Sequence, residues 1–217
     1  MTTTPPTTPP HPTPTPTPPP TAPADGANSP AGTDSPDSPA AAPRTPPPAG
    51  PDDAPPVSPE TVRRFLYREA RHLDDREFEK WLECYHPEAE FWMPAWADDE
   101  ELTRDPRTEI SLIYYANRGG LEDRIFRIRT DRSSATSLPE PRTGHNITNM
   151  EITGESGGVV DVRFNWFTLY YRYQTVDTYF GTSFYRVDFS GDAPLILAKK
   201  VVLKNDYVHH VVDVYHV

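Results

Sequence analysis

The chain has 217 residues, a formal net charge of −11 and a single cysteine, Cys84. One cysteine excludes a disulfide framework, and the acidic balance argues against a nucleic-acid partner, which would need a basic surface. No run of 18 apolar residues and no secretory signal pattern is present, so we expect no membrane span and a cytoplasmic protein.

The first 59 residues differ in composition from the rest. They hold 22 of the 28 prolines, whereas all 24 aromatic residues lie in the remaining 158. Such a segment has too little apolar side chain to offset the entropy of ordering it. Residues 1–57 are therefore predicted to be a disordered Thr/Pro-rich tail, with a docking segment for a proline-recognising domain as the alternative. Residues 58–217 are predicted to form one folded domain.

The folded domain is predicted to begin with a helix. Ser58 can cap the first turn, and Pro59 suits the first helical position. Apolar residues then recur at helical spacing as far as Leu73. A second helix is predicted directly afterwards, because Asp74 and Glu77 have the spacing of a capping box.

The second helix is expected to keep its apolar residues on one face and to end near Pro87. Residues 90–96 are typical of a short strand. Residues 108–115 are predicted to form a third helix, closed by the glycine pair that follows. Residues 121–130 fit either a helix or a strand.

The last third of the chain has the pattern of strands. Apolar and polar residues alternate in four segments that are rich in β-branched and aromatic residues: 159–173, 178–189, 195–203 and 207–217. Turns are predicted at 154–158 and 190–194. Helices followed by strands indicate an α+β domain, with helices packed on one face of a curved antiparallel sheet.

One predicted strand carries aromatic residues on both of its faces. Phe164, Trp166 and Tyr170 share one side, and Phe167 and Tyr171 share the other. We interpret the first side as covering the helices and the second as a contact with another subunit. The alternative is a wide core with ordinary surface tyrosines.

A metal site is not indicated. Cys84 stands among apolar residues and is interpreted as a buried core thiol. On a helix, the segment from Asp206 to His216 would offer iron two histidines and a carboxylate. Its valines favour a strand instead, in which His209 and His210 would point to opposite faces.

An acid–base site inside an apolar pocket is a further possibility for a domain of this class. The candidate residues are His72, Asp74, Asp75, Tyr114, Tyr115 and His145. Asp74 is already assigned to helix capping, and His145 lies in a polar connection or an edge strand that we expect to be exposed. No acid–base pair is therefore predicted.

Several joined stretches resemble a known family. Residues 73–85 and 89–94 resemble the opening of nuclear-transport-factor-2-like (cystatin-like) cone domains. Further stretches resemble the small (β) subunit of aromatic-ring-hydroxylating dioxygenases, with the benzoate 1,2-dioxygenase type the most similar. These stretches are residues 109–115, 117–124, 132–143 and 199–207. The resemblance covers residues 58–217.

The resemblance implies a division of labour between subunits. The large (α) subunit would carry a Rieske [2Fe–2S] cluster and a mononuclear iron, and a reductase would deliver electrons from NADH to cis-dihydroxylate an aromatic acid. This chain would be a non-catalytic structural subunit without a cofactor, in a hexamer of three α and three β chains. Its composition agrees, since a Rieske centre needs two cysteines and two histidines.

Five residues are predicted to contact other subunits: Glu140, Arg142, His145, Tyr215 and His216. Arg142 could form a bidentate pair with a carboxylate of the partner, or it could be a solvated loop arginine. Two alternatives remain open at this point. The chain could be a stand-alone cone-fold isomerase or dehydratase, or a small-molecule binding module of the same fold.

Overall fold

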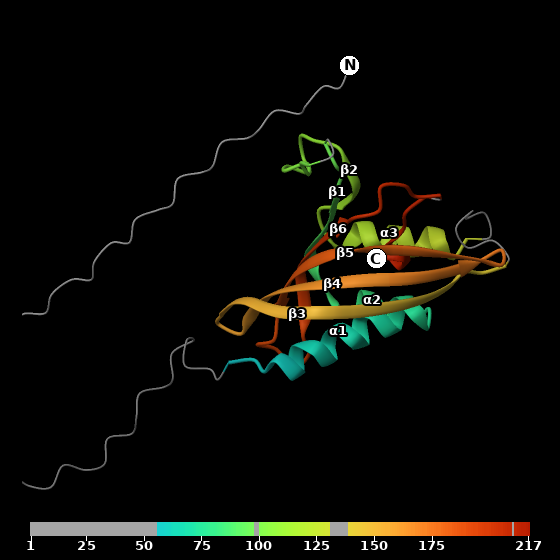
Figure 1. Cartoon of the computed structure of the whole chain (residues 1–217). Coiled ribbons are helices and arrows are strands. Elements are labelled where there is room, and N and C mark those ends of the chain that lie inside the picture. Colours follow the sequence, from blue (N-terminus) through green and yellow to red (C-terminus); the bar gives the residue numbers. More distant parts are fainter. Residues whose placement is uncertain (1–55, 98–99, 131–138, 210) are drawn as a thin grey trace, which may run out of the picture. The chain divides into compact units, whose positions relative to one another are not determined.

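The computed structural model describes residues 56–97, 100–130, 139–209 and 211–217. Helices come first and most strands afterwards, which confirms the predicted α+β class (Figure 1). The predicted tail lies outside these residues, apart from Pro56 and Val57. The elements are α1 (Pro59–Asp74), α2 (Phe78–Leu82), β1 (Tyr85–Pro94), β2 (Ser111–Tyr115), α3 (Arg118–Ile128), β3 (Arg142–Ser156), β4 (Val159–Arg172), β5 (Thr175–Asp188), β6 (Leu195–Leu203) and the 3₁₀ helix η1 (Val214–His216).

The six strands form one curved sheet in the order β2-β1-β6-β5-β4-β3. Neighbouring strands are antiparallel, as predicted, with the exception of β1, which runs parallel to β6. The helices lie on one side of this sheet, with α1 packed against β3 and α3 against β1 (Figure 1). This arrangement confirms the predicted cone, in which a curved sheet wraps around helices.

Helix α1 forms where the sequence predicts it. The Ser58 hydroxyl accepts a hydrogen bond from the Thr61 N–H at 3.1 Å, and Pro59 occupies the first turn. The side chains that recur at helical spacing are buried against the sheet: Val62, Phe65, Leu66, Ala70 and Leu73. The helix is therefore held mainly by packing of its apolar face.

The second helix is shorter than predicted, and the prediction of a capping box at its start is wrong. Helix α2 ends at Leu82, so Tyr85 begins strand β1 and Pro87 lies within that strand. Glu77 is the N-cap residue, but its side chain makes no capping hydrogen bond. The Asp74 carboxylate accepts a hydrogen bond from the His145 N–H on strand β3 instead. This donor from a distant segment replaces the backbone N–H groups of α2 that a capping box would use.

The predicted third helix at residues 108–115 is also wrong. Ser111–Tyr115 form strand β2, which pairs with β1 through Trp92 opposite Tyr114. The Trp92 indole N–H also donates to the Ser111 hydroxyl at 3.0 Å. Pairing along the edge of β1 thus overrides a weak helical pattern. The ambiguous stretch that follows is helix α3, capped by the Asn117 side chain.

The predicted last strand does not form. Residues 211–217 end in the single 3₁₀ turn η1, which is fixed by local hydrogen bonds. The Asp213 carboxylate accepts from the Val214 N–H, and the Asp213 N–H donates to His216 Nδ1, both at 2.8 Å. The Arg124 guanidinium pairs with Asp213 and ties the segment to α3. These bonds satisfy the backbone without a neighbouring strand.

Two glycine positions have a clear steric reason. Gly157 and Gly158 both have positive φ in the tight turn that joins β3 to β4, as this kind of hairpin turn requires. At Gly181 on β5, a Cβ would stand 2.0 Å from the Val202 carbonyl oxygen and 3.0 Å from the Trp166 ring. The sheet therefore brings backbone and indole closer at Gly181 than any side chain would permit.

Candidate functional site

The outer face of the sheet, away from the helices, exposes a group of large apolar side chains. On β4 the residues alternate between buried and exposed, as the sequence predicts for its two aromatic faces. Phe167 on β4 stands directly opposite Phe180 on β5, and both rings are more than a third exposed. We call the following set the outer aromatic face: Phe167, Leu169, Tyr171, Val176, Phe180 and Phe184.

Two cations border the outer aromatic face, Arg142 beside Tyr171 and Lys200 beside Phe184. The Arg142 guanidinium lies over the Tyr171 ring, 5.8 Å from its centroid, and the Lys200 ammonium lies 4.4 Å from the Trp92 ring. Partial burial lowers the pKa of Lys200. An apolar centre with aromatic residues and a charged rim is the composition of a protein–protein interface rather than that of a small-molecule pocket.

The inner face encloses a buried ion pair that the sequence analysis missed. The Glu69 carboxylate on α1 and the Lys199 ammonium on β6 are 3.2 Å apart, and both side chains are almost fully buried. Trp81 and Tyr85 also donate hydrogen bonds to Glu69, at 2.8 and 3.0 Å. The Tyr185 hydroxyl donates to its other oxygen at 3.4 Å.

The environment keeps Glu69 ionised. Burial works to raise its pKa, but the charge of Lys199 and the hydrogen bonds it accepts outweigh burial and hold that pKa below its usual value. Burial and the Glu69 charge raise the pKa of Tyr85 and Tyr185 well above normal, so both hydroxyls remain donors. All five groups already have partners, which fits a structural network better than a catalytic one.

The sequence did contain a signal for this network. Position 69 falls on the buried stripe of α1, four residues after Phe65 and four before Leu73. Position 199 likewise falls on the inward side of a strand that alternates, directly opposite Phe91. A charged residue on each of two predicted core faces would have indicated a buried pair.

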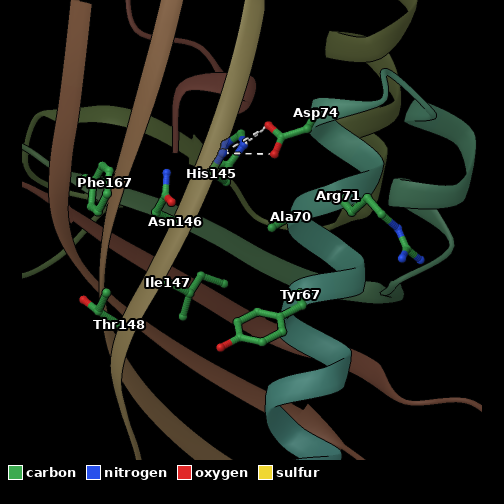
Figure 2. Close-up of a pocket in the computed structure, with 9 residues that line it drawn as sticks. All are labelled: Tyr67, Ala70, Arg71, Asp74, His145, Asn146, Ile147, Thr148 and Phe167. Atoms are coloured by element: carbon green, nitrogen blue, oxygen red, sulfur yellow. Dashed lines mark hydrogen bonds and ion pairs between the residues drawn. The ribbon is translucent and has the colours of Figure 1, made fainter.

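The predicted exposure of His145 is wrong, whereas an edge strand, one of its two predicted placements, is correct. His145 lies on strand β3, its side chain is only 8% exposed, and its Nδ1 is 2.6 Å from the Asp74 carboxylate (Figure 2). The same carboxylate accepts hydrogen bonds from the His145 N–H and from the Thr143 hydroxyl. An Asp–His pair therefore exists, but it pins the end of α1 to the edge strand of the sheet.

The chemistry of this pair is limited by its surroundings. Burial works to raise the pKa of Asp74, but the bonds to His145 and Thr143 outweigh it and lower that pKa. The remaining ring nitrogen of His145, Nε2, is buried and lacks a hydrogen-bond partner within the described part of the chain. A groove of about 530 Å³ passes beside the pair, between α1 and β3 (Figure 2). Because Nε2 is inaccessible, the pair presents no base to a ligand in that groove.

The other predicted contact residues lie in different environments. Glu140 is exposed and forms an ion pair with Arg76, and Arg142 is exposed at the start of β3. Tyr215 and His216 are buried inside this chain, where their rings pack against Tyr170. The contact role of all five residues, including His145, stays a prediction. Because Tyr215 and His216 are buried, they would influence a subunit contact only through the residues that cover them.

The candidate metal and thiol residues are also placed. Cys84 is buried in the turn between α2 and β1, and burial raises the pKa of its thiol to about 12, which confirms an inert core cysteine. His209 packs on the Tyr207 ring, and His210 lies outside the described residues. In the part of the chain that the structure describes, no group of three or more His, Cys, Asp or Glu residues is placed to hold a metal ion.

The helices carry one further observation. Across the described ranges, none of them is both long enough and apolar enough to cross a bilayer.

Comparison with known proteins gives consistent matches. The family model described as "Ring hydroxylating beta subunit" matches residues 68–210. The chain is 62% identical over 161 residues to the toluate 1,2-dioxygenase subunit beta of Pseudomonas putida, a match that covers 74% of this chain and 99% of that protein. It is 57% identical to the benzoate 1,2-dioxygenase subunit beta of Acinetobacter baylyi, covering 74% of this chain and 95% of the relative.

The solved structures agree with the sequence matches. The beta subunit of the benzoate 1,2-dioxygenase from Burkholderia mallei superposes with a TM-score of 0.66 at 53% identity. That match covers 76% of this chain and 100% of the Burkholderia chain.

Proposed function

The chain belongs to the family of ring-hydroxylating dioxygenase beta subunits, and from this membership we propose that it is the non-catalytic small subunit of an aromatic-acid 1,2-dioxygenase. Benzoate and toluate name the substrate class, because the relatives that match over nearly their full length carry those names. The chain would contribute to oxidation of the aromatic ring as one component of the enzyme complex. The proposed alternatives, a stand-alone isomerase or dehydratase or a binding module, are not supported.

The observation that carries this proposal in the structure is the contrast between a closed interior and the outer aromatic face. In the interior, the opposite charges of Glu69 and Lys199 are bonded to each other. The exposed rings of Phe167 and Phe180, in contrast, are available for burial by the surface of another chain. Burying such rings between chains stabilises an assembly by the hydrophobic effect.

The oxygen chemistry would take place in a partner. We propose that the α subunit of the complex holds the Rieske cluster and the mononuclear iron, because the single, buried Cys84 cannot supply the two cysteines of a Rieske site. A reductase would deliver electrons from NADH to that subunit. A hexamer of three α and three β chains would be consistent with an interface on more than one side of this chain.

The contact residues can be ranked by their accessibility. Glu140 and Arg142 are exposed near the edge of the sheet, and Arg142 already lies over Tyr171 of the outer aromatic face. We therefore propose that these two contact a neighbouring subunit directly. His145, Tyr215 and His216 would support that surface from beneath.

The boundaries of the proposed subunit domain follow from the sequence and the family match. We propose that residues 58–217 make up the β-subunit domain and that residues 1–57 are an appended tail. The match over residues 68–210 falls entirely within the proposed domain.

Co-expression with a Rieske-type α chain tests the proposed function. We expect the two chains to co-elute as one complex, with all iron assigned to the α chain and with oxidation of an aromatic acid by the complex alone. Metal analysis and gel filtration of each chain and of the mixture provide the readout. Stoichiometric iron in this chain by itself, or turnover of an aromatic acid by it alone, would contradict the proposal.

A further inference from the structure

The inner face of the sheet holds four buried polar groups that make no hydrogen bond within the described part of the chain. They are His145 Nε2, the Trp166 indole N–H, the Thr168 hydroxyl and the Tyr179 hydroxyl. The side chain of His145 and the other three residues are each more than nine-tenths buried. Buried polar groups in proteins nearly always have a partner, which is either another protein group or ordered water. These four exceptions therefore call for an explanation.

The four groups belong to neighbouring positions on three adjacent strands. His145 on β3 stands opposite Thr168 on β4, and Thr168 stands opposite Tyr179 on β5. Side chains at directly opposite positions have Cβ atoms only about 5 Å apart. Trp166 lies two residues before Thr168 on the same face of β4, and its ring covers Gly181, two residues after Tyr179. We call these four side chains the inner polar cluster.

Thr168 is the shortest member of the inner polar cluster. Its side chain stands between the longer rings of His145 and Tyr179, yet its hydroxyl bonds to neither of them. Polar groups that are close neighbours without a direct bond are commonly bridged by a water molecule. The His216 ring packs 4.4 Å from the Tyr179 ring, so η1 helps to cover the cluster.

The bond between Asp74 and His145 determines what Nε2 can do. Nδ1 of His145 faces the Asp74 carboxylate on α1 at 2.6 Å (Figure 2). A carboxylate accepts hydrogen bonds, so Nδ1 carries the proton of a neutral ring and Nε2 is left as an acceptor. The two nitrogens of an imidazole point to different sides of the ring. Nε2 is therefore directed away from the Asp74 carboxylate.

The donors and acceptors of the inner polar cluster identify the molecule that it would bind. The Trp166 indole N–H can only donate, whereas Nε2 of a neutral His145 ring can only accept. Burial raises the pKa of Tyr179 to about 12, so its hydroxyl keeps its proton and can donate and accept, as the Thr168 hydroxyl can. A cation would be opposed by the indole N–H, and an anion by the lone pair of Nε2. The cluster suits a small neutral molecule that both donates and accepts.

We propose that the inner polar cluster is a binding site for one or two ordered water molecules, which bridge β3, β4 and β5. Each buried water makes about three hydrogen bonds, so one or two suffice for four groups. Water would accept from Trp166 and donate to Nε2, with the two hydroxyls completing its bonds. The His145 ring would then be held on both sides, by Asp74 at Nδ1 and by water at Nε2. This inference does not depend on the proposed subunit function.

Oxygen-17 relaxation dispersion of the solvent tests the proposal in the full-length chain. The method counts long-lived internal waters and is not affected by exchange of hydroxyl protons. We expect Thr168→Val combined with Tyr179→Phe, which keeps the side-chain shapes, to lower the count by about one or two waters. The matched control is Tyr185→Phe, which removes a buried hydroxyl of the same strand that already donates to Glu69. The control should leave the count unchanged.

A crystal structure of the full-length chain locates the water. We expect a density peak of single-water size about 2.6–3.2 Å from His145 Nε2 and from at least one of the two hydroxyls. A direct bond between two members of the cluster, density of a larger molecule, or no peak would each overturn the proposal. An unchanged water count in the double variant, or an equal loss in Tyr185→Phe, would do the same. If the double variant failed to fold, the wild-type density would still decide.

Discussion

The two faces of the sheet differ in which groups they bury and which they expose. The inner face encloses the charged pair Glu69–Lys199, whereas the outer face leaves Phe167, Phe180 and Phe184 exposed to water. Charged residues are rarely fully buried without a partner, and clustered exposed rings are rare on a surface that stays uncovered. Each face thus departs from the usual pattern, and the two departures have different causes.

The buried charge of the inner face is compensated by partners within the chain, whereas the exposed rings of the outer face are not covered by described residues of the chain. Glu69 accepts hydrogen bonds from four side chains of the same domain, so its charge needs no further partner. The rings outside have no such compensation within the described residues and gain only if another surface covers them. Buried polar groups that are bonded to one another, such as Glu69 and Lys199, indicate a role in stability. A cluster of exposed aromatic rings indicates a surface for assembly.

The largest expected effect is on the inner face. Glu69→Ala leaves the buried Lys199 ammonium without a counter-charge, with only the Val217 carbonyl oxygen at 3.4 Å as an acceptor, and it removes the acceptor of two buried tyrosine hydroxyls. We expect the free energy of unfolding to fall by about 3–5 kcal/mol in urea titrations. The control is Glu79→Ala, whose carboxylate pairs with Arg129 on the surface and whose loss should cost less than about 1 kcal/mol. A similar small cost for both variants would show that the buried pair contributes little.

A change on the outer face should spare folding but impair assembly. Phe180→Asp places a charge opposite Phe167, at the centre of the proposed interface. We expect the affinity for the α subunit to fall about 30-fold or more, as at interface hot spots, which is about 2 kcal/mol. Binding measured by sedimentation, with urea stability as the companion readout, checks this.

Phe126→Asp on α3 is the matched control for the outer face. Phe126 is 72% exposed but lies outside the outer aromatic face, so its substitution should not alter binding. If both variants assembled equally well, the outer aromatic face would not be the interface.

A smaller effect is expected at Asp74, where α1 meets the edge strand. Its pKa is lowered in the folded chain, so its stabilising contribution is complete above the normal aspartate pKa of about 4 and is lost as the pH falls through the lowered value. Asp74→Asn should therefore cost about 1–2 kcal/mol at pH 7 and less at pH 3, which lies below the normal aspartate pKa. Urea titrations at both pH values measure this, with the exposed neighbour Asp75→Asn as the control. A cost that did not change with pH would exclude this role for the Asp74 carboxylate.

The smallest effect is expected in the hairpin that joins β4 and β5. Tyr173 and Gln174 both have positive φ there, at 50° and 64°, a conformation that glycine adopts more easily. Gln174→Gly should raise the free energy of unfolding by about 0.5–1 kcal/mol. Gln174→Ala, which keeps the strain, should give no such gain. Equal stability of the two variants would show that the turn is not strained.

The sequence predicted the strands best where one face is buried along the whole length. β4 alternates along its length, and β5 and β6 alternate over part of theirs; the positions of all three strands and the two-sided aromatic character of β4 are confirmed. β2 was mistaken for a helix because it is only five residues long and gains its stability from pairing with β1. Short edge strands carry little periodicity of their own.

The side-chain pairs were harder to predict because they join distant segments. Asp74 and His145 are 71 residues apart, and the local capping pattern gave a simpler interpretation of Asp74. The partners Glu69 and Lys199 are 130 residues apart, and only their placement on buried faces links them. The spacing of residues in one chain segment cannot reveal which other segment will lie beside it.

The parallel pairing of β1 with β6 has a consequence for how the protein is made. Phe91 and Lys199 are neighbours in the sheet, although they are separated by about 110 residues. A ribosome must therefore release nearly the whole polypeptide before the centre of the sheet can close, and pairings of such long range form slowly. Until then β1 has an unpaired edge, so chaperones or rapid completion of translation would protect the nascent chain from aggregation.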